Sequence, residues 1–144
     1  MMFHELYQSV ILDHYRHPSN VGRIEGAQQV YNDHPSCGDK VLLSVVVEDG
    51  IVADIAYEGS GCSISQASLS LMTEAVKGKP LTEIRVLYDA FREMIRGTEP
   101  DEQVLGDMVA LSGVSKFAAR VPCALLSWET LAQVLPLDEA PSAD

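Results

Sequence analysis

The segment that most constrains the fold is VLLSVVVEDGIVADIAYEGSG, residues 41–61. Two runs rich in β-branched residues flank Asp49-Gly50, which is a favoured two-residue hairpin turn. In the second run, strict alternation places Ile51, Ala53, Ile55 and Tyr57 on one face and their neighbours on the other. This pattern predicts an antiparallel hairpin with one buried face, so other parts of the chain have to cover that face.

Helices are predicted on both sides of the hairpin. Apolar residues recur at helical spacing, and Pro or Gly ends each run, in the segments 2–18, 63–80, 81–100 and 121–135. A shorter helical piece is expected within 101–111, where Gly106 interrupts it, and residues 21–33 form a loop leading into a short strand. The order helix, strands, helices predicts an α+β fold. In it, a small antiparallel sheet of about three strands is covered by helices on one face.

Length and charge narrow the class of protein further. The 144 residues predict a single domain over 1–144 whose last residues, 136–144, form a flexible tail. The net charge of −11 disfavours binding to nucleic-acid phosphates. No apolar run reaches the roughly 20 residues of a membrane span, and the N-terminal segment lacks the continuous apolar core of a signal peptide. We therefore expect no membrane association and a cytoplasmic location.

The three cysteines all fall at predicted joints between elements. Cys37 lies in the turn before the hairpin, Cys62 follows the hairpin in GSGCS at the entrance of a helix, and Cys123 lies near the start of the last helix. A thiolate near a helix N-terminus is stabilised by the helix dipole, and Asp39 is close enough to Cys37 to reach the same ion. Three cysteines and one aspartate satisfy the four-coordinate preference of Zn²⁺, and could also hold an iron–sulfur cluster.

The surrounding motifs resemble a known family. PSCGD, GSGCSISQASLSLMTE and VPCALLSWETL are similar to the three cysteine motifs of the IscU/SufU iron–sulfur cluster assembly proteins, the NifU N-terminal-like family. The opening LYQSVILDHYRHPSNVG resembles the first helix of that family. The IscU type carries a histidine immediately before the third cysteine, where this chain has Pro122, and residues 83–111 look like the additional segment of the SufU type. The SufU branch is the closer match.

The resemblance implies a zinc-bound sulfur acceptor with Cys37, Asp39, Cys62 and Cys123 as the metal ligands. Such proteins take persulfide sulfur from a pyridoxal-phosphate-dependent cysteine desulfurase of the SufS type. They then pass it to downstream iron–sulfur assembly machinery. Cys37 would be the acceptor, after a desulfurase histidine replaces it on the zinc, and Arg120 would assist the transfer. His34 stands where the family has asparagine and has no assigned role.

Three functions remain open at this point. The first is the zinc-dependent sulfurtransferase just described, which would be a carrier enzyme acting with its desulfurase. The second is a scaffold that itself assembles and transfers a [2Fe–2S] cluster, with iron in place of zinc. The third is an interaction domain whose zinc serves folding alone. Pro122 in place of the histidine favours the first over the second, and the glycines around two cysteines favour an accessible site over a sealed one.

Overall fold

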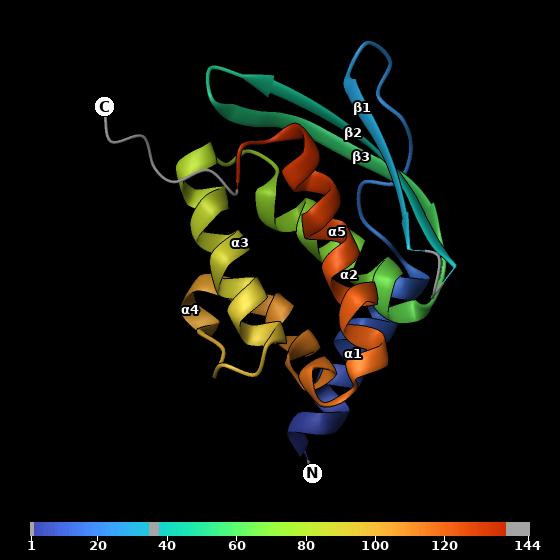
Figure 1. Ribbon diagram of the computed structural model, residues 1–144, viewed down its shortest axis with the longest axis vertical. Helices are drawn as coiled ribbons and strands as arrows, with labels where there is room; N and C mark the ends of the chain where they lie inside the picture. Colours follow the sequence, from blue (N-terminus) through green and yellow to red (C-terminus); the bar gives the residue numbers. More distant parts are fainter. Residues whose placement is uncertain (1, 35–37, 138–144) are drawn as a thin grey trace.

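The computed structural model describes the backbone of residues 2–34 and 38–137, and the side chains of 8–34 and 38–137. One layer is a three-stranded antiparallel sheet in the order β1-β2-β3, made of β1 (Gln28–His34), β2 (Asp39–Glu48) and β3 (Ile51–Ser60). The second layer is helical and lies on one face of that sheet (Figure 1). The α+β architecture predicted from the sequence is therefore confirmed.

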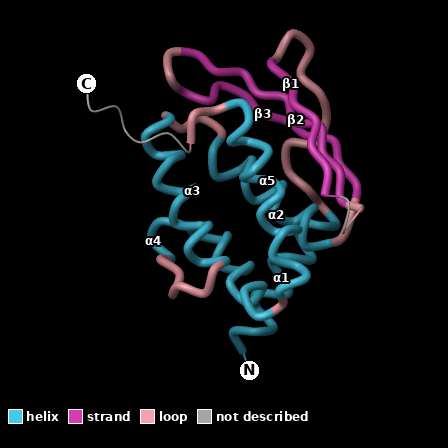
Figure 2. Tube along the Cα trace, in the orientation of Figure 1, coloured by secondary structure: helices cyan, strands magenta, loops and turns pink. Residues whose placement is uncertain are grey.

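Five α-helices and two 3₁₀ helices, η1 and η2, make up the helical layer of the described chain. Their bounds are α1 Met2–Arg16, α2 Ser63–Val76, α3 Leu81–Ile95, α4 Glu102–Leu105, η1 Gly106–Lys116, η2 Ala118–Arg120 and α5 Val121–Val134. Helices α2 and α5 pack directly against the strands, while α1 packs on α2 and α3 packs on η1 and α5 (Figure 2). No helix in the described part of the chain is long and apolar enough to cross a membrane.

The hairpin turn forms as the sequence predicts. Asp49 and Gly50 have φ values of +54° and +76°, the pair of positive values that a tight hairpin turn requires. The predicted strict alternation along β3 does not hold throughout the strand, however. Ile51 is 40% exposed whereas Val52 is fully buried. A register shift between Val46 and Val47 leaves Ala53 as an extra residue in β3, and such a bulge exchanges the two faces of a strand.

The helix predicted within 101–111 is also different in detail. Asp101 caps a single α-helical turn by accepting hydrogen bonds from Gln103 N and Val104 N. Gly106 then adopts φ +55°, and the chain continues as η1. The interruption that Gly106 indicated is real, but it changes the type of helix rather than ending the helical structure.

The core lies between the sheet and the helices. The largest fully buried side chains include Trp128, Tyr57, Phe91 and Leu43. Leu137 is also buried, so packing continues to this point in the segment where the sequence predicted a tail. The rest of that predicted tail, 138–144, lies outside the described residues.

Candidate metal centre

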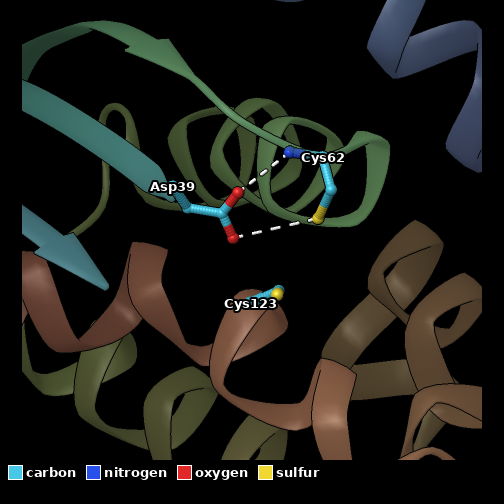
Figure 3. A group of neighbouring side chains, drawn as sticks. All are labelled: Asp39, Cys62 and Cys123. Atoms are coloured by element: carbon cyan, nitrogen blue, oxygen red, sulfur yellow. Dashed lines mark hydrogen bonds between the residues drawn. The ribbon is translucent and has the colours of Figure 1, made fainter. Parts of the chain in front are cut away.

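Three of the four predicted ligands meet at one end of the sheet. Asp39 begins β2, Cys62 precedes α2, and Cys123 lies in the first turn of α5 (Figure 3). One carboxylate oxygen and the two Sγ atoms all lie within 4.8 Å of one another. Asp39 and Cys123 are fully buried and Cys62 is half-buried. The fourth predicted ligand, Cys37, lies outside the described residues.

Asp39 is held by the chain that leads into α2. Its Oδ1 accepts a hydrogen bond from the backbone N–H of Cys62 at 2.9 Å, and its Oδ2 lies 3.8 Å from Cys62 Sγ. This backbone contact fixes the carboxylate next to the Cys62 thiol. No sequence pattern indicates this contact, because it joins segments 23 residues apart through a main-chain donor.

Gly61 makes this close approach possible. A Cβ atom on Gly61 would lie 2.1 Å from Asp39 Oδ1 and 2.9 Å from Ser65 Oγ. Gly61 also adopts φ +148°, a backbone conformation that side chains with a Cβ rarely adopt. The sequence predicted that the glycines around Cys62 allow the backbone to approach a ligand. At Gly61 the approaching group is the Asp39 carboxylate.

Cys62 is the N-cap residue of α2. Its Sγ accepts a hydrogen bond from Ser65 N at 3.5 Å, and Ser65 Oγ donates to Cys62 O at 3.1 Å. The Cys62 sulfur therefore lies at the positive end of the α2 helix dipole. Cys123 lies one residue after Pro122 in the first turn of α5, where the missing proline N–H costs no hydrogen bond.

Arg120 lies at the exposed side of the two sulfurs. A hydrogen bond to Cys123 and, secondarily, the charges of Cys62 and Cys123 raise the pKa of the Arg120 guanidinium above its usual value. The side chain is fully exposed, so its charge faces both the sulfurs and solvent. Phe117, at the junction of η1 and η2, is 62% exposed, and the sequence did not single it out.

The donor set fits zinc. Zinc binds thiolate sulfur at about 2.3 Å and carboxylate oxygen at about 2.0–2.2 Å, so ligand atoms of one tetrahedral ion lie roughly 3.3–3.8 Å apart. The separation of 3.8 Å between Asp39 Oδ2 and Cys62 Sγ matches this range. All three ligand atoms lie within 4.8 Å of one another, so small side-chain shifts would bring the remaining distances into the same range. The three described residues could therefore provide three of the four positions of a tetrahedral site.

His34 ends β1 and pairs in register with Asp39. It is half-buried, and its carbonyl oxygen accepts a hydrogen bond from Gly38 N at 2.9 Å. This bond links the last residue of β1 to the residue that precedes β2.

The fold and the site together define an α+β domain with a buried carboxylate and two thiols at one end of its sheet. The sequence matches the NifU-like N terminal domain over residues 6–124. The chain belongs to this family, and the resemblance to the IscU/SufU proteins is confirmed.

Two curated relatives and one solved structure illustrate the match. The chain is 44% identical to the "Zinc-dependent sulfurtransferase SufU" of Bacillus subtilis, covering 93% of this chain and 92% of that protein. It is 40% identical to the "Iron-sulfur cluster assembly scaffold protein IscU" of Streptococcus pyogenes, covering 90% and 82%. A crystal structure of a candidate iron–sulfur cluster assembly scaffold protein for the SUF system from Fervidobacterium islandicum superimposes with a TM-score of 0.82. The two chains are 36% identical, and the match covers 90% of this chain and 96% of that one.

Proposed function

We propose that the chain is a zinc-dependent sulfurtransferase that accepts persulfide sulfur from a pyridoxal-phosphate-dependent cysteine desulfurase of the SufS type. In this role it supplies downstream iron–sulfur cluster assembly. The observation that carries the proposal is the convergence of Asp39, Cys62 and Cys123 within 4.8 Å, with the Arg120 guanidinium beside both sulfurs. The name of the Bacillus subtilis relative supports the same activity.

Cys37, Asp39, Cys62 and Cys123 would hold the metal. When bound, zinc keeps its thiolate ligands deprotonated near neutral pH and protects them from oxidation. Asp39 contributes the single oxygen ligand, and the backbone N–H of Cys62 orients that carboxylate. Among the described residues, Cys62 and Cys123 form no disulfide, which fits the reducing cytoplasm in which we place the protein.

Cys37 would be the acceptor. Its thiolate attacks the terminal sulfur of the donor's cysteine persulfide, so the donor's S–S bond breaks as a new S–S bond forms on Cys37. The donor cysteine leaves as a thiolate, and the exchange needs no additional oxidant or reductant. Arg120 would stabilise the negative charge of the reacting sulfurs, because its exposed guanidinium already lies beside two of them.

The experiment is a sulfur-transfer assay with the desulfurase. We expect Cys37→Ala to abolish both persulfide loading and stimulation of the desulfurase. Arg120→Ala should slow transfer by about tenfold or more at unchanged zinc content, and Arg120→Lys should recover part of that loss. Full stimulation by Cys37→Ala would show that the acceptor is another residue.

The same protein preparations distinguish the sulfurtransferase function from that of a cluster scaffold and from that of a purely structural zinc site. A chain that assembles clusters would give a stable visible chromophore on anaerobic reconstitution with iron and sulfide, and this cluster would persist in the presence of zinc. A purely structural site would give one zinc per chain and no sulfur on any cysteine after incubation with the desulfurase. Either result would replace the sulfurtransferase function.

A further inference from the structure

The outer edge of β3 is covered by the chain itself at two places. At one end Val52 N donates to Lys79 O at 3.0 Å, and Gly78 N donates to Val52 O at 2.7 Å. Farther along, Tyr57 N donates to Asn20 O at 2.9 Å, and Gly22 N donates to Tyr57 O at 2.8 Å. The second contact is a single parallel bridge between Val21 and Tyr57. Both segments fill edge positions that would otherwise be open to another strand.

Gly59 is an open position on this edge. Residues of an antiparallel strand alternate in the direction of their backbone groups, and Tyr57 directs both of its groups outward. Gly59, two residues farther on, therefore does the same, and it is exposed. Arg23 still pairs with Glu58 through its side chain, but among the described residues no backbone hydrogen bond follows that of Gly22 along this edge, and none reaches Gly59.

A cavity lined by apolar side chains together with Ser60 and Gln66 lies beside this open position. Its volume is about 330 Å³, and its walls include Tyr15, Val21, Gly59 and Gly61. Tyr15 is 47% exposed and Val21 is 58% exposed, so an apolar group entering the cavity would remove both from water. An unpaired strand edge with an adjacent apolar pocket is the arrangement that binds an extended peptide.

The cavity and the metal centre share one wall. The segment Gly59–Gly61 borders the cavity, and Gly61 contacts Asp39 so closely that a Cβ atom cannot fit between them. The next residue is Cys62. A peptide paired with Gly59 would therefore lie beside the segment that leads into Cys62.

We propose that the edge of β3 at Gly59, with the Tyr15–Val21 cavity, docks an extended apolar segment of the sulfur-donating protein. The proposal rests on the proposed function, since it names the docking site for the same transfer. Its position beside Cys62 assigns the occupant to the protein that delivers sulfur there. The net charge of −11 favours a segment flanked by basic residues and repels a second copy of this chain.

The first test measures stimulation of the desulfurase as a function of the concentration of this protein. It compares variants in which an exposed valine is replaced. Val21→Ser should raise the concentration required for half-maximal stimulation by about tenfold, the effect of exposing one buried valine. The maximal rate and the zinc content should not change. The matched control is Val86→Ser, because Val86 is 55% exposed on α3 and should leave the titration unaltered. Tyr15→Ser is a second test variant, and Tyr31→Ser is its matched control. The two tyrosine side chains are 47% and 56% exposed.

The second test follows the Gly59 amide directly. In the wild-type chain saturated with desulfurase, hydrogen exchange at Gly59 should slow by at least about tenfold, because its N–H becomes a strand hydrogen bond. Unchanged exchange in the saturated complex, or equal titrations for Val21→Ser and Val86→Ser, would overturn the proposal. A wild-type chain that binds no desulfurase would instead overturn the sulfurtransferase function itself. If Val21→Ser altered self-association and not desulfurase binding, the occupant would be a second copy, which also contradicts the proposal.

Discussion

Two regions of the molecule are organised in different ways. At the candidate metal centre, three possible ligands come from three separate segments, and a single missing Cβ atom at Gly61 allows them to meet. Between α3 and α5, Trp128 packs against Tyr88 and Phe91 with ring centroids 6.1 Å and 5.8 Å apart, and all three side chains are buried.

The two regions are stabilised by different kinds of interaction. The aromatic cluster is stabilised by many weak contacts, so its loss should lower stability without affecting the ligands. The metal centre depends on a few backbone positions and buries a carboxylate, so small changes there should affect metal binding more than packing.

The largest effect is expected for Gly61→Ala. The new Cβ would lie 2.1 Å from Asp39 Oδ1, so the carboxylate or the segment before α2 has to move. We expect zinc content to fall to background. The free energy of unfolding should also fall by more than about 3 kcal/mol. Metal analysis and denaturant unfolding measure the two effects.

Gly97→Ala is the control for the backbone contribution. Gly97 also has a positive φ, +111°, but its Cβ would meet no atom within 4 Å. Gly97→Ala should lower the free energy of unfolding only by the roughly 1–3 kcal/mol that backbone strain costs. It should keep its zinc. If both variants lost zinc equally, close packing at Gly61 would not be the cause.

Trp128→Ala tests the aromatic cluster. Removing this fully buried side chain should lower the free energy of unfolding by about 3–5 kcal/mol. At low temperature, the folded fraction should still bind one zinc per chain. Val86→Ala, an exposed apolar truncation on α3, should change stability by less than about 0.5 kcal/mol. Loss of zinc from folded Trp128→Ala would show that packing, too, positions the ligands.

Asp39→Asn should weaken zinc binding but stabilise the zinc-free protein. The amide oxygen can still accept the hydrogen bond from Cys62 N, but the negative charge is lost. Zinc affinity should fall by at least about tenfold, while the zinc-free protein should gain about 1 kcal/mol because a buried charge is removed. Competition with a zinc chelator measures the zinc affinity, and unfolding of the zinc-free protein measures its stability.

Asp33→Asn, an exposed change on β1, is the matched control for charge and should alter neither quantity. A zinc-free Asp39→Asn protein that is less stable than the wild type would contradict the interpretation of Asp39 as a residue whose charge serves the metal.

Tyr57→Phe should have the smallest effect at neutral pH. The buried Tyr57 hydroxyl has no hydrogen bond of normal geometry among the described residues. Removing it should change stability by less than about 1 kcal/mol, in the stabilising direction. Burial raises the pKa of Tyr57 to about 12, with the nearby Ser70 hydroxyl offsetting part of the effect.

The pH dependence of this variant follows from that shift. The unfolded chain loses the tyrosine proton near pH 10 and the folded chain near pH 12, so wild-type stability should fall as pH rises through this interval. Tyr57→Phe lacks this contribution, and unfolding at pH 8 and pH 11 should show its advantage increasing. Tyr31→Phe, at an exposed tyrosine, should show no such trend.

Local sequence signals predicted most of the fold. Asp49-Gly50 indicated the hairpin, and helical periodicity indicated α2, α3 and α5, because turn chemistry and amphipathic spacing are properties of short segments. The bulge at Ala53 left no such signal. It arises from the pairing of β3 with β2, and it exchanges the faces of Ile51 and Val52.

The candidate site was predictable in its residues but not in its contacts. Cysteine placement at element ends identified Cys62 and Cys123, and Asp39 followed from its distance to Cys37 along the chain. The hydrogen bond from Cys62 N to Asp39 was not predictable, because the donor is a main-chain group that every residue except proline has. The open edge at Gly59 depends likewise on where the Asn20–Gly22 segment ends its pairing.

The central claim is that Asp39, Cys62 and Cys123 are ligands of one zinc ion together with Cys37. Metal analysis of aerobically purified protein, alongside Cys37→Ser, Cys62→Ser and Cys123→Ser, tests it most directly. We predict about one zinc per chain for the wild type and a substantial loss for each variant. A stably folded wild type without metal, or variants that all retain the full amount of zinc, would contradict this claim.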